Sequence, residues 1–182
     1  MSSIKKIVAI CGSTRENSTN LKYINAIIDL TRNKWQVTIY KELAKLPHFN
    51  PDLDFTQDNN LVEVVNFRNH IKESDAVLIC TPEYAMGIPG SLKNAIDWTV
   101  SSCEFSHKPV ALITASSSGK KAHQSLLETL NVIEADIDAD TEAIISFAQT
   151  KINNESVITD IATKQTVEKI IAALTQKTEA AH

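Results

Sequence analysis

Short apolar segments alternate along this chain with segments whose apolar residues recur at helical spacing. We expect strands at residues 4–11, 37–40, 76–80, 110–114 and 134–137. Residues 76–80 are apolar throughout, which is typical of a central strand buried on both faces of a parallel sheet. The alternation of strands and helices predicts an α/β fold.

The helices are expected where apolar residues share one face of a 3.6-residue period. These segments are marked by Leu21–Ile28, Leu61–Ile71, Leu92–Val100, Leu126–Ile133 and Val167–Leu174. Pro89 suits the first turn of the third segment, Thr159 is the expected N-cap of the last, and Asp160 suits its positive end. Residues 141–154 fit no element firmly. We expect one domain over residues 1–177, followed by a frayed tail at 178–182.

Composition narrows the function classes. With 182 residues, 43% hydrophobic and 22% charged, the chain fits one globular domain. A net charge of -4 disfavours nucleic acid as a partner, and three cysteines without CxxC spacing indicate neither a disulfide framework nor a zinc site. The apolar runs are too short for a signal peptide or a bilayer span, so we expect a cytoplasmic protein without a membrane partner.

The polar loop at residues 12–20 suggests an anion site. Ligands of doubly wound sheets bind beyond the carboxyl ends of the strands, where this loop opens. Its sequence, GSTRENSTN, supplies hydroxyls and an arginine and leads directly into a helix, which together suit a phosphate monoester. It lacks the GxGxxG and P-loop patterns, which favours a single terminal phosphate. The alternative interpretation is a Ser/Thr-rich helix cap with one solvated arginine.

Three motifs in chain order resemble those of the NADPH-dependent FMN reductase family. They are Gly12-Ser13-x-Arg15-x-x-Ser18-x-Asn20, then LPxxNPD at 46–52, then Pro82-Glu83-Tyr84 followed by IPG at 88–90 and LKNAIDW at 92–98. The similarity covers about residues 4–174. It implies a flavodoxin-like, five-stranded parallel sheet of order 2-1-3-4-5, with helices on both faces.

The resemblance also implies an activity. NADPH or NADH would supply electrons through bound FMN to a small acceptor, such as a flavin, a quinone, an azo compound or chromate. The chemistry takes place on FMN, so no catalytic side chain and no metal is expected. The alternative is a flavodoxin-like electron carrier without NAD(P)H turnover, which the absence of a concentrated acidic block in the sequence disfavours.

Carried over by position, the resemblance places FMN in three loops. The expected cofactor-binding residues are Ser13, Arg15, Ser18, Thr19 and Asn20 around the phosphate, Pro82, Glu83, Tyr84, Ala85 and Met86 near the ring, and Ser116, Ser117 and Gly119 on its other side. Arg15 and Ser18 lie in a polar loop, so we expect them to contribute little to stability.

Two departures from the family pattern stand out. Ala85 replaces a usual asparagine, and Gly119-Lys120-Lys121-Ala122 replaces a glycine-rich stretch. The two lysines either attract the 2′-phosphate of NADPH or are simply solvated.

The resemblance further implies a homodimer or homotetramer, with the apolar stretch 86–89 at the interface. Cys11 and Cys80 end neighbouring strands in the expected order. Buried thiols there are either small hydrophobes or redox-active groups.

Overall fold

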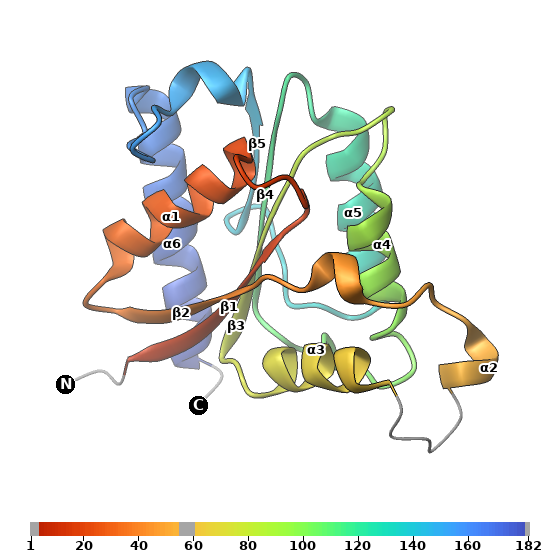
Figure 1. Cartoon of the computed structure of the whole chain (residues 1–182). Helices are drawn as coiled ribbons and strands as arrows, with labels where there is room; N and C mark the ends of the chain where they lie inside the picture. Colours follow the sequence, from red (N-terminus) through yellow and green to blue (C-terminus); the bar gives the residue numbers. More distant parts are fainter. Residues whose placement is uncertain (1–3, 55–60, 181–182) are drawn as a thin grey trace.

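The computed structural model describes residues 4–54 and 61–180 and contains a five-stranded parallel sheet (Figure 1). The strands are β1 (Lys5–Cys11), β2 (Trp35–Tyr40), β3 (Ala76–Thr81), β4 (Val110–Ser116) and β5 (Glu142–Ser146). Their order is β2-β1-β3-β4-β5, which confirms the predicted flavodoxin-like topology. Within the described ranges, no helix is both long and apolar enough to cross a membrane.

Helices cover both faces of the sheet (Figure 1). On one face lie α1 (Thr19–Thr31) and α6 (Ile161–Ala180), and on the other lie α3 (Val62–Lys72), α4 (Gly90–Asp97) and α5 (Lys120–Val132). The short elements are η1 (Leu43–Lys45), α2 (Pro51–Asp54) and η2 (Ala148–Lys151). The five longer helices bury most of the apolar residues that the sequence period predicts, but Val65 of α3 is exposed, and Val100 is exposed and lies beyond the end of α4.

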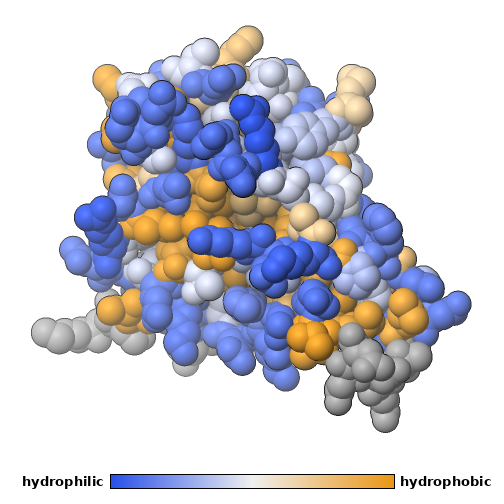
Figure 2. Space-filling view, in the orientation of Figure 1, coloured by the Kyte–Doolittle hydropathy of each residue, from blue (hydrophilic) through white to orange (hydrophobic). Residues whose placement is uncertain are grey.

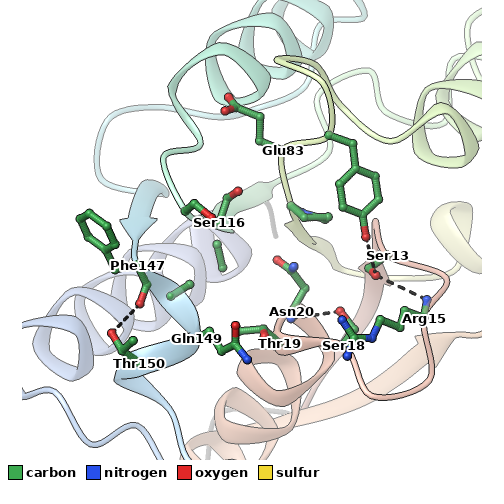
Figure 3. A pocket seen from close by; sticks show the side chains of 15 residues that line it. Ser13, Arg15, Ser18, Thr19, Asn20, Glu83, Ser116, Phe147, Gln149 and Thr150 are labelled. Carbon is green, nitrogen blue, oxygen red and sulfur yellow. Dashed lines mark hydrogen bonds between the residues drawn. The ribbon is translucent and has the colours of Figure 1, made fainter.

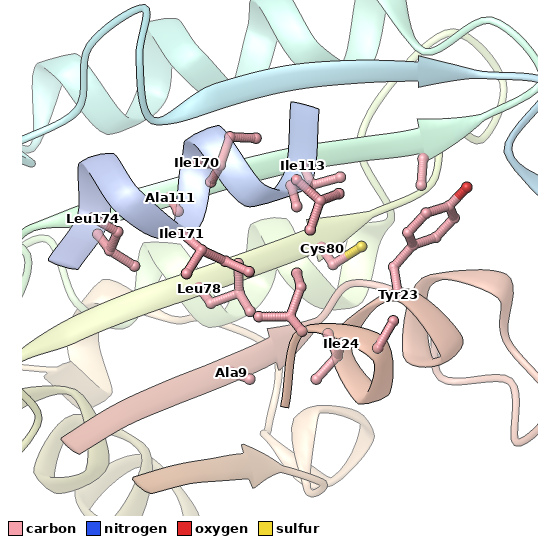
Figure 4. Close-up of a cluster of buried hydrophobic side chains, with 14 of the residues drawn as sticks. Ala9, Tyr23, Ile24, Leu78, Cys80, Ala111, Ile113, Ile170, Ile171 and Leu174 are labelled. Atoms are coloured by element: carbon pink, nitrogen blue, oxygen red, sulfur yellow. The ribbon is translucent and has the colours of Figure 1, made fainter. Parts of the chain in front are cut away.

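Strand β3 lies at the centre of the core. All of its residues are buried, as expected for a strand covered on both faces. Leu78 and Cys80 face the α1–α6 side with Ile24 and Leu174, as Figure 4 shows. Val77 and Ile79 belong to the opposite cluster.

The sheet register brings three loops to one edge. Cys11 pairs with Cys80, Thr81 with Thr114, and Ser116 with Ser146. Because all the strands are parallel, the loops that follow them open on the same side.

The predicted last strand at 134–137 was wrong. Glu134 has a φ of 60°, which turns the chain away from α5, and within the described residues the segment forms a single bridge, Pro109 with Asp136. Ala135 and Ile137 are apolar because they pack on the core as a loop. The true strand, β5, begins at Glu142, inside the segment that the sequence left unassigned.

Helix α6 also differs from expectation. Its cap is Asp160, whose Oδ1 accepts the Thr163 backbone N–H at 2.8 Å, and not Thr159. Hydrogen bonds from the side chain and the backbone of Thr163 lower the pKa of Asp160. The helix continues through Ala180 where fraying was expected, because Thr178 is buried and its carbonyl accepts a 2.8 Å hydrogen bond from Lys5 Nζ. Residues 181 and 182 lie outside the described part of the chain.

Candidate functional site

A cavity of about 370 Å³ opens at the carboxyl edge of the sheet (Figure 3). Its walls come from the loops after β1, β3 and β4 and from the segment after β5. The predicted residues that line it are Ser13, Arg15, Ser18, Thr19, Asn20, Pro82, Glu83, Tyr84, Ser116 and Ser117. The remaining predicted residues, Ala85, Met86 and Gly119, are not part of its lining.

The N-terminus of α1 forms the polar end of this cavity. Ser18 is the N-cap, and its Oγ accepts the Asn20 backbone N–H at 3.2 Å. Ser13 Oγ accepts the Arg15 backbone N–H at 3.4 Å and lies 3.2 Å from the Tyr84 hydroxyl. The first turn of α1, which is fully described, holds no acidic side chain. Hydroxyls, a helix N-terminus and a guanidinium therefore converge where an anion would be stabilised.

The glycine that precedes this loop is required by close packing. A Cβ at Gly12 would lie 2.8 Å from Thr81 Cβ and 3.1 Å from Leu92 Cδ2, on β3 and α4. The absence of a side chain lets the β1 loop pass next to the end of β3. This contact holds two walls of the cavity together.

Two buried thiols lie beneath the polar end. Cys11 Sγ donates to the Ser13 carbonyl at 3.3 Å, and Cys80 Sγ donates to Asn20 Oδ1 at 3.3 Å. Burial raises the pKa of both thiols, so they stay protonated donors at neutral pH. Because the Asn20 oxygen is engaged by Cys80, its NH₂ group is the part of the amide left to donate to a ligand in the cavity.

Glu83 has a structural partner that the sequence did not reveal. Its Oε2 accepts the backbone N–H groups of Lys121 at 2.8 Å and Ala122 at 3.0 Å. The carboxylate thus caps the positive end of α5, just after Gly119, whose φ of 89° starts the helix. The side chains of Lys120 and Lys121 are exposed. Glu83 therefore ties the β3 loop to α5.

The tip of the β3 loop is a two-residue turn. Tyr84 and Gly87 exchange two backbone hydrogen bonds of 2.9 Å. Between them, Ala85 and Met86 have φ values of 49° and 64°, the geometry of a type I′ turn, and both are exposed. Asparagine, usual in the family at position 85, tolerates this backbone better than alanine does. The departure at Ala85 thus affects a turn outside the cavity.

Comparison with known sequences identifies the family. The sequence profile of NADPH-dependent FMN reductases matches residues 5–150. The chain belongs to the NADPH-dependent FMN reductase family.

Two relatives and one solved structure align with this FMN reductase family member along nearly their full lengths. The chain is 30% identical over 179 residues to an NAD(P)H-dependent FMN reductase of Pseudomonas aeruginosa, covering 96% of this chain and 95% of that protein. It is 29% identical over 176 residues to an NAD(P)H:quinone oxidoreductase of Solanum tuberosum, covering 93% and 90%. The solved structure of FerB, a flavoenzyme NAD(P)H:(acceptor) oxidoreductase from Paracoccus denitrificans, superposes with a TM-score of 0.82 at 25% identity, covering 97% and 98%.

One wall of the cavity was missed in the sequence of this FMN reductase family member. Beyond the predicted loops, the lining includes Ala115 and the run Phe147, Ala148, Gln149 and Thr150. Phe147 is 69% exposed with a φ of 52°, and its backbone N–H donates to the Ser117 carbonyl at 3.2 Å. In Figure 3 it lies at the opposite end of the cavity from Arg15. Placing the last strand at 142–146 would have revealed this loop, because it follows a parallel strand.

The residues present fit FMN. Ser18 Oγ accepts the Asn20 backbone N–H, so the hydroxyl proton of Ser18 can be donated to a phosphate. The cavity extends from this donor-rich end toward Pro82, Ser116 and Phe147, where main chain and apolar surface can receive a flat ring. Among the described residues, no group of three or more His, Cys, Asp or Glu could hold a metal ion.

Proposed function

We propose that this protein is an NAD(P)H-dependent oxidoreductase that passes electrons through FMN, bound in the cavity, to a small acceptor. The observation that supports this most directly is the junction of the α1 N-terminus with the Pro82–Tyr84 loop. Ser13 and Tyr84, one from each loop, meet at 3.2 Å and line the same cavity. Membership of the NADPH-dependent FMN reductase family supports an oxidation–reduction reaction.

Each wall has a defined task in this proposal. Ser13, Ser18 and Asn20 donate to the phosphate, and Arg15 adds a charge-assisted hydrogen bond. The Pro82–Tyr84 main chain orients the polar edge of the ring, while Ser116, Ser117 and Phe147 limit access of water from the other side. When bound, FMN supplies hydride and electron transfer between the nicotinamide and the acceptor.

The acceptor is proposed to be a small organic molecule. Relatives carry names such as quinone reductase in Pseudomonas putida and NADPH azoreductase in a Bacillus species. A quinone, a flavin and an azo compound are flat and conjugated, and the exposed aromatic side chains of Tyr84 and Phe147, which both line the cavity, can contact such a molecule.

We also propose that the protein works in the cytoplasm as a homodimer or homotetramer. Of the stretch 86–89 expected at the interface, Met86 is 72% exposed, whereas Ile88 is half-buried and Pro89 is buried. Tyr84, which lines the cavity, is 51% exposed. Figure 2 shows a further apolar area across the middle of the viewed face, bordered by hydrophilic residues. Apolar surface of this kind favours association. Light scattering should give a mass above the 20.1 kDa of one chain, whereas a monomer at micromolar concentration would contradict the assembly.

The activity is tested on purified protein reconstituted with FMN. Under anaerobic conditions, NADPH or NADH should bleach the flavin absorbance, and a quinone should restore it. An electron carrier would bind FMN but stay oxidised with NAD(P)H. A protein that binds no FMN would overturn the proposal entirely.

A further inference from the structure

A second hollow lies beside the candidate FMN cavity. It has a volume of about 450 Å³ and is lined by Arg15, Asn17, Thr19, Lys22, Gln149 and Asn154. Arg15, Thr19 and Gln149 line both hollows. Figure 3 shows these three residues along one side of the first cavity. The two hollows therefore meet at the end where the phosphate is proposed to lie.

The second hollow has the charge of an anion site. Its lining residues include two cations, Arg15 and Lys22, and no aspartate or glutamate. Lys22 Nζ donates to Asn154 Oδ1 at 2.8 Å, which fixes the ammonium beside the loop that follows η2. An ammonium has three donors, so two remain for a ligand. The carboxamides of Asn17, Gln149 and Asn154 add further polar groups.

Lys22 and the phosphate loop belong to one rigid unit. The Lys22 backbone N–H donates to the Ser18 carbonyl at 3.1 Å, so Lys22 lies one helical turn beyond the N-cap. Arg15 lies between the two hollows and can contact phosphate oxygens on both sides through its planar fork of donors. A second phosphate joined to the first would thus pass from the α1 N-terminus toward Lys22.

We propose that the second hollow is a subsite for the second phosphate of a pyrophosphate-linked ligand, so that the site accepts FAD as well as FMN. This inference rests on the proposed function, because it assumes that the first cavity binds the flavin phosphate. The shared wall of Arg15, Thr19 and Gln149 allows one ligand to occupy both hollows. Lys22 then distinguishes the two flavins, since FMN ends before it.

The same positive charge could instead serve the 2′-phosphate of NADP⁺. Both ligands use phosphate oxygens, but only FAD links the second phosphate covalently to the flavin. Separate titrations with FAD and with NADP⁺ distinguish the two sources.

The test is a fluorescence titration of apo-protein with riboflavin, FMN and FAD. Lys22→Ala should lower the affinity for FAD by about fivefold to tenfold, while the affinities for FMN and riboflavin should change by less than about twofold. Lys22→Arg should keep most of the FAD affinity, because it retains the charge. Lys169→Ala, on the exposed face of α6, is the matched control and should change nothing.

The outcomes separate this inference from the proposed function. If FMN binds but FAD does not, or if Lys22→Ala weakens FMN and FAD equally, the second subsite is wrong and FMN binding stands. If Lys22→Ala weakens NADP⁺ and leaves FAD unchanged, the hollow serves the 2′-phosphate and the inference fails. If wild-type protein binds no flavin, the proposed function itself fails.

Discussion

The thiol of Cys80, at the end of β3, donates a 3.3 Å hydrogen bond to the side-chain oxygen of Asn20 in the first turn of α1. Cys80 is fully buried and Asn20 nearly so. The thiol therefore determines which end of the amide faces the cavity. This relationship connects the core of the sheet directly to the proposed phosphate site.

Replacing Cys80 should lower the affinity for FMN more than the affinity for riboflavin. In Cys80→Ala the Asn20 oxygen loses its donor, and the amide is free to turn its oxygen toward the phosphate. Loss of about 1 kcal/mol corresponds to roughly fivefold in FMN affinity. Fluorescence titration with both flavins measures the ratio.

The conservative variant Cys80→Ser is the control for packing. Its hydroxyl still donates, so it should restore most of the FMN-to-riboflavin ratio even where it lowers stability. Equal losses for the two flavins in Cys80→Ala would show that the thiol acts only through packing.

Substitutions at Ser18 and Arg15 should differ in their effect on stability. Ser18 was expected to matter little for the fold, but it is buried and caps α1, so Ser18→Ala should lower the free energy of unfolding by about 1 kcal/mol. Arg15→Ala removes an exposed side chain and should leave stability within about 0.5 kcal/mol. It should weaken FMN by roughly tenfold to a hundredfold, because a charge-assisted hydrogen bond contributes about 1.5–3 kcal/mol.

Riboflavin provides the internal control for Arg15, since it lacks the phosphate. Urea unfolding and flavin titration on the same preparations give both quantities. If Arg15→Ala lowered the affinities for FMN and riboflavin equally, this loop would not be the phosphate site.

Local sequence patterns predicted most of the fold and much of the cavity lining. Residues 76–80 are apolar because both faces of β3 are covered, and that cause acts at every position of the segment. The loops after β1, β3 and β4 could be placed because parallel strands end at one edge. The resemblance of the motifs to those of FMN reductases then predicted the cofactor and the type of reaction, which hydrophobic periodicity alone does not indicate.

The errors arise where distant contacts decide the outcome. Ile137 is apolar because it packs on the core from a loop, so its pattern imitates a strand. The carboxylate of Glu83 is oriented by backbone N–H groups 38 and 39 residues later, a contact that no local pattern encodes. Phe147 was missed because its wall depends on the placement of β5.

The turn at Ala85 and Met86 should become more stable with residues that favour positive φ. Ala85→Asn combined with Met86→Gly gives the Asn-Gly pair preferred in type I′ turns. We expect a gain on the order of 1 kcal/mol in the free energy of unfolding, because L side chains are strained there. Chemical denaturation measures it.

Flavin affinity is expected to change little in that variant, because neither residue lines the cavity. If Ala85→Asn alone altered FMN binding several-fold, position 85 would act on the cofactor and not only on the turn.

The three cysteines should differ in reactivity. Cys103 is exposed, whereas Cys11 and Cys80 are buried with raised pKa values. At pH 8, a thiol reagent should modify Cys103 rapidly in native protein and the other two only on unfolding. Mass spectrometry of partially modified protein identifies the sites.

The raised pKa values also set a pH dependence. The unfolded thiols lose their protons near the reference value of 9.0, while the native thiols keep theirs to higher pH. Their contribution to stability is therefore complete below pH 9 and declines as pH rises toward the native pKa. Cys80→Ser should reduce this loss of stability at alkaline pH. If the dependence of stability on pH were unchanged in Cys80→Ser, the Cys80 thiol would not be a source of this loss.

Glu83 should support both stability and flavin binding through α5. Glu83→Ala removes the acceptor for two backbone N–H groups and the charge at the helix N-terminus, so we expect a loss of about 1–2 kcal/mol. Glu83→Gln retains an acceptor and should lose less stability.

Since Glu83 also anchors the Pro82–Tyr84 loop, the affinities for riboflavin and FMN should fall together in Glu83→Ala, unlike in Arg15→Ala. Thermal unfolding and flavin titration, with Glu155→Ala on an exposed loop as control, test this. Unchanged affinity for both flavins would show that the loop keeps its shape without this link to α5.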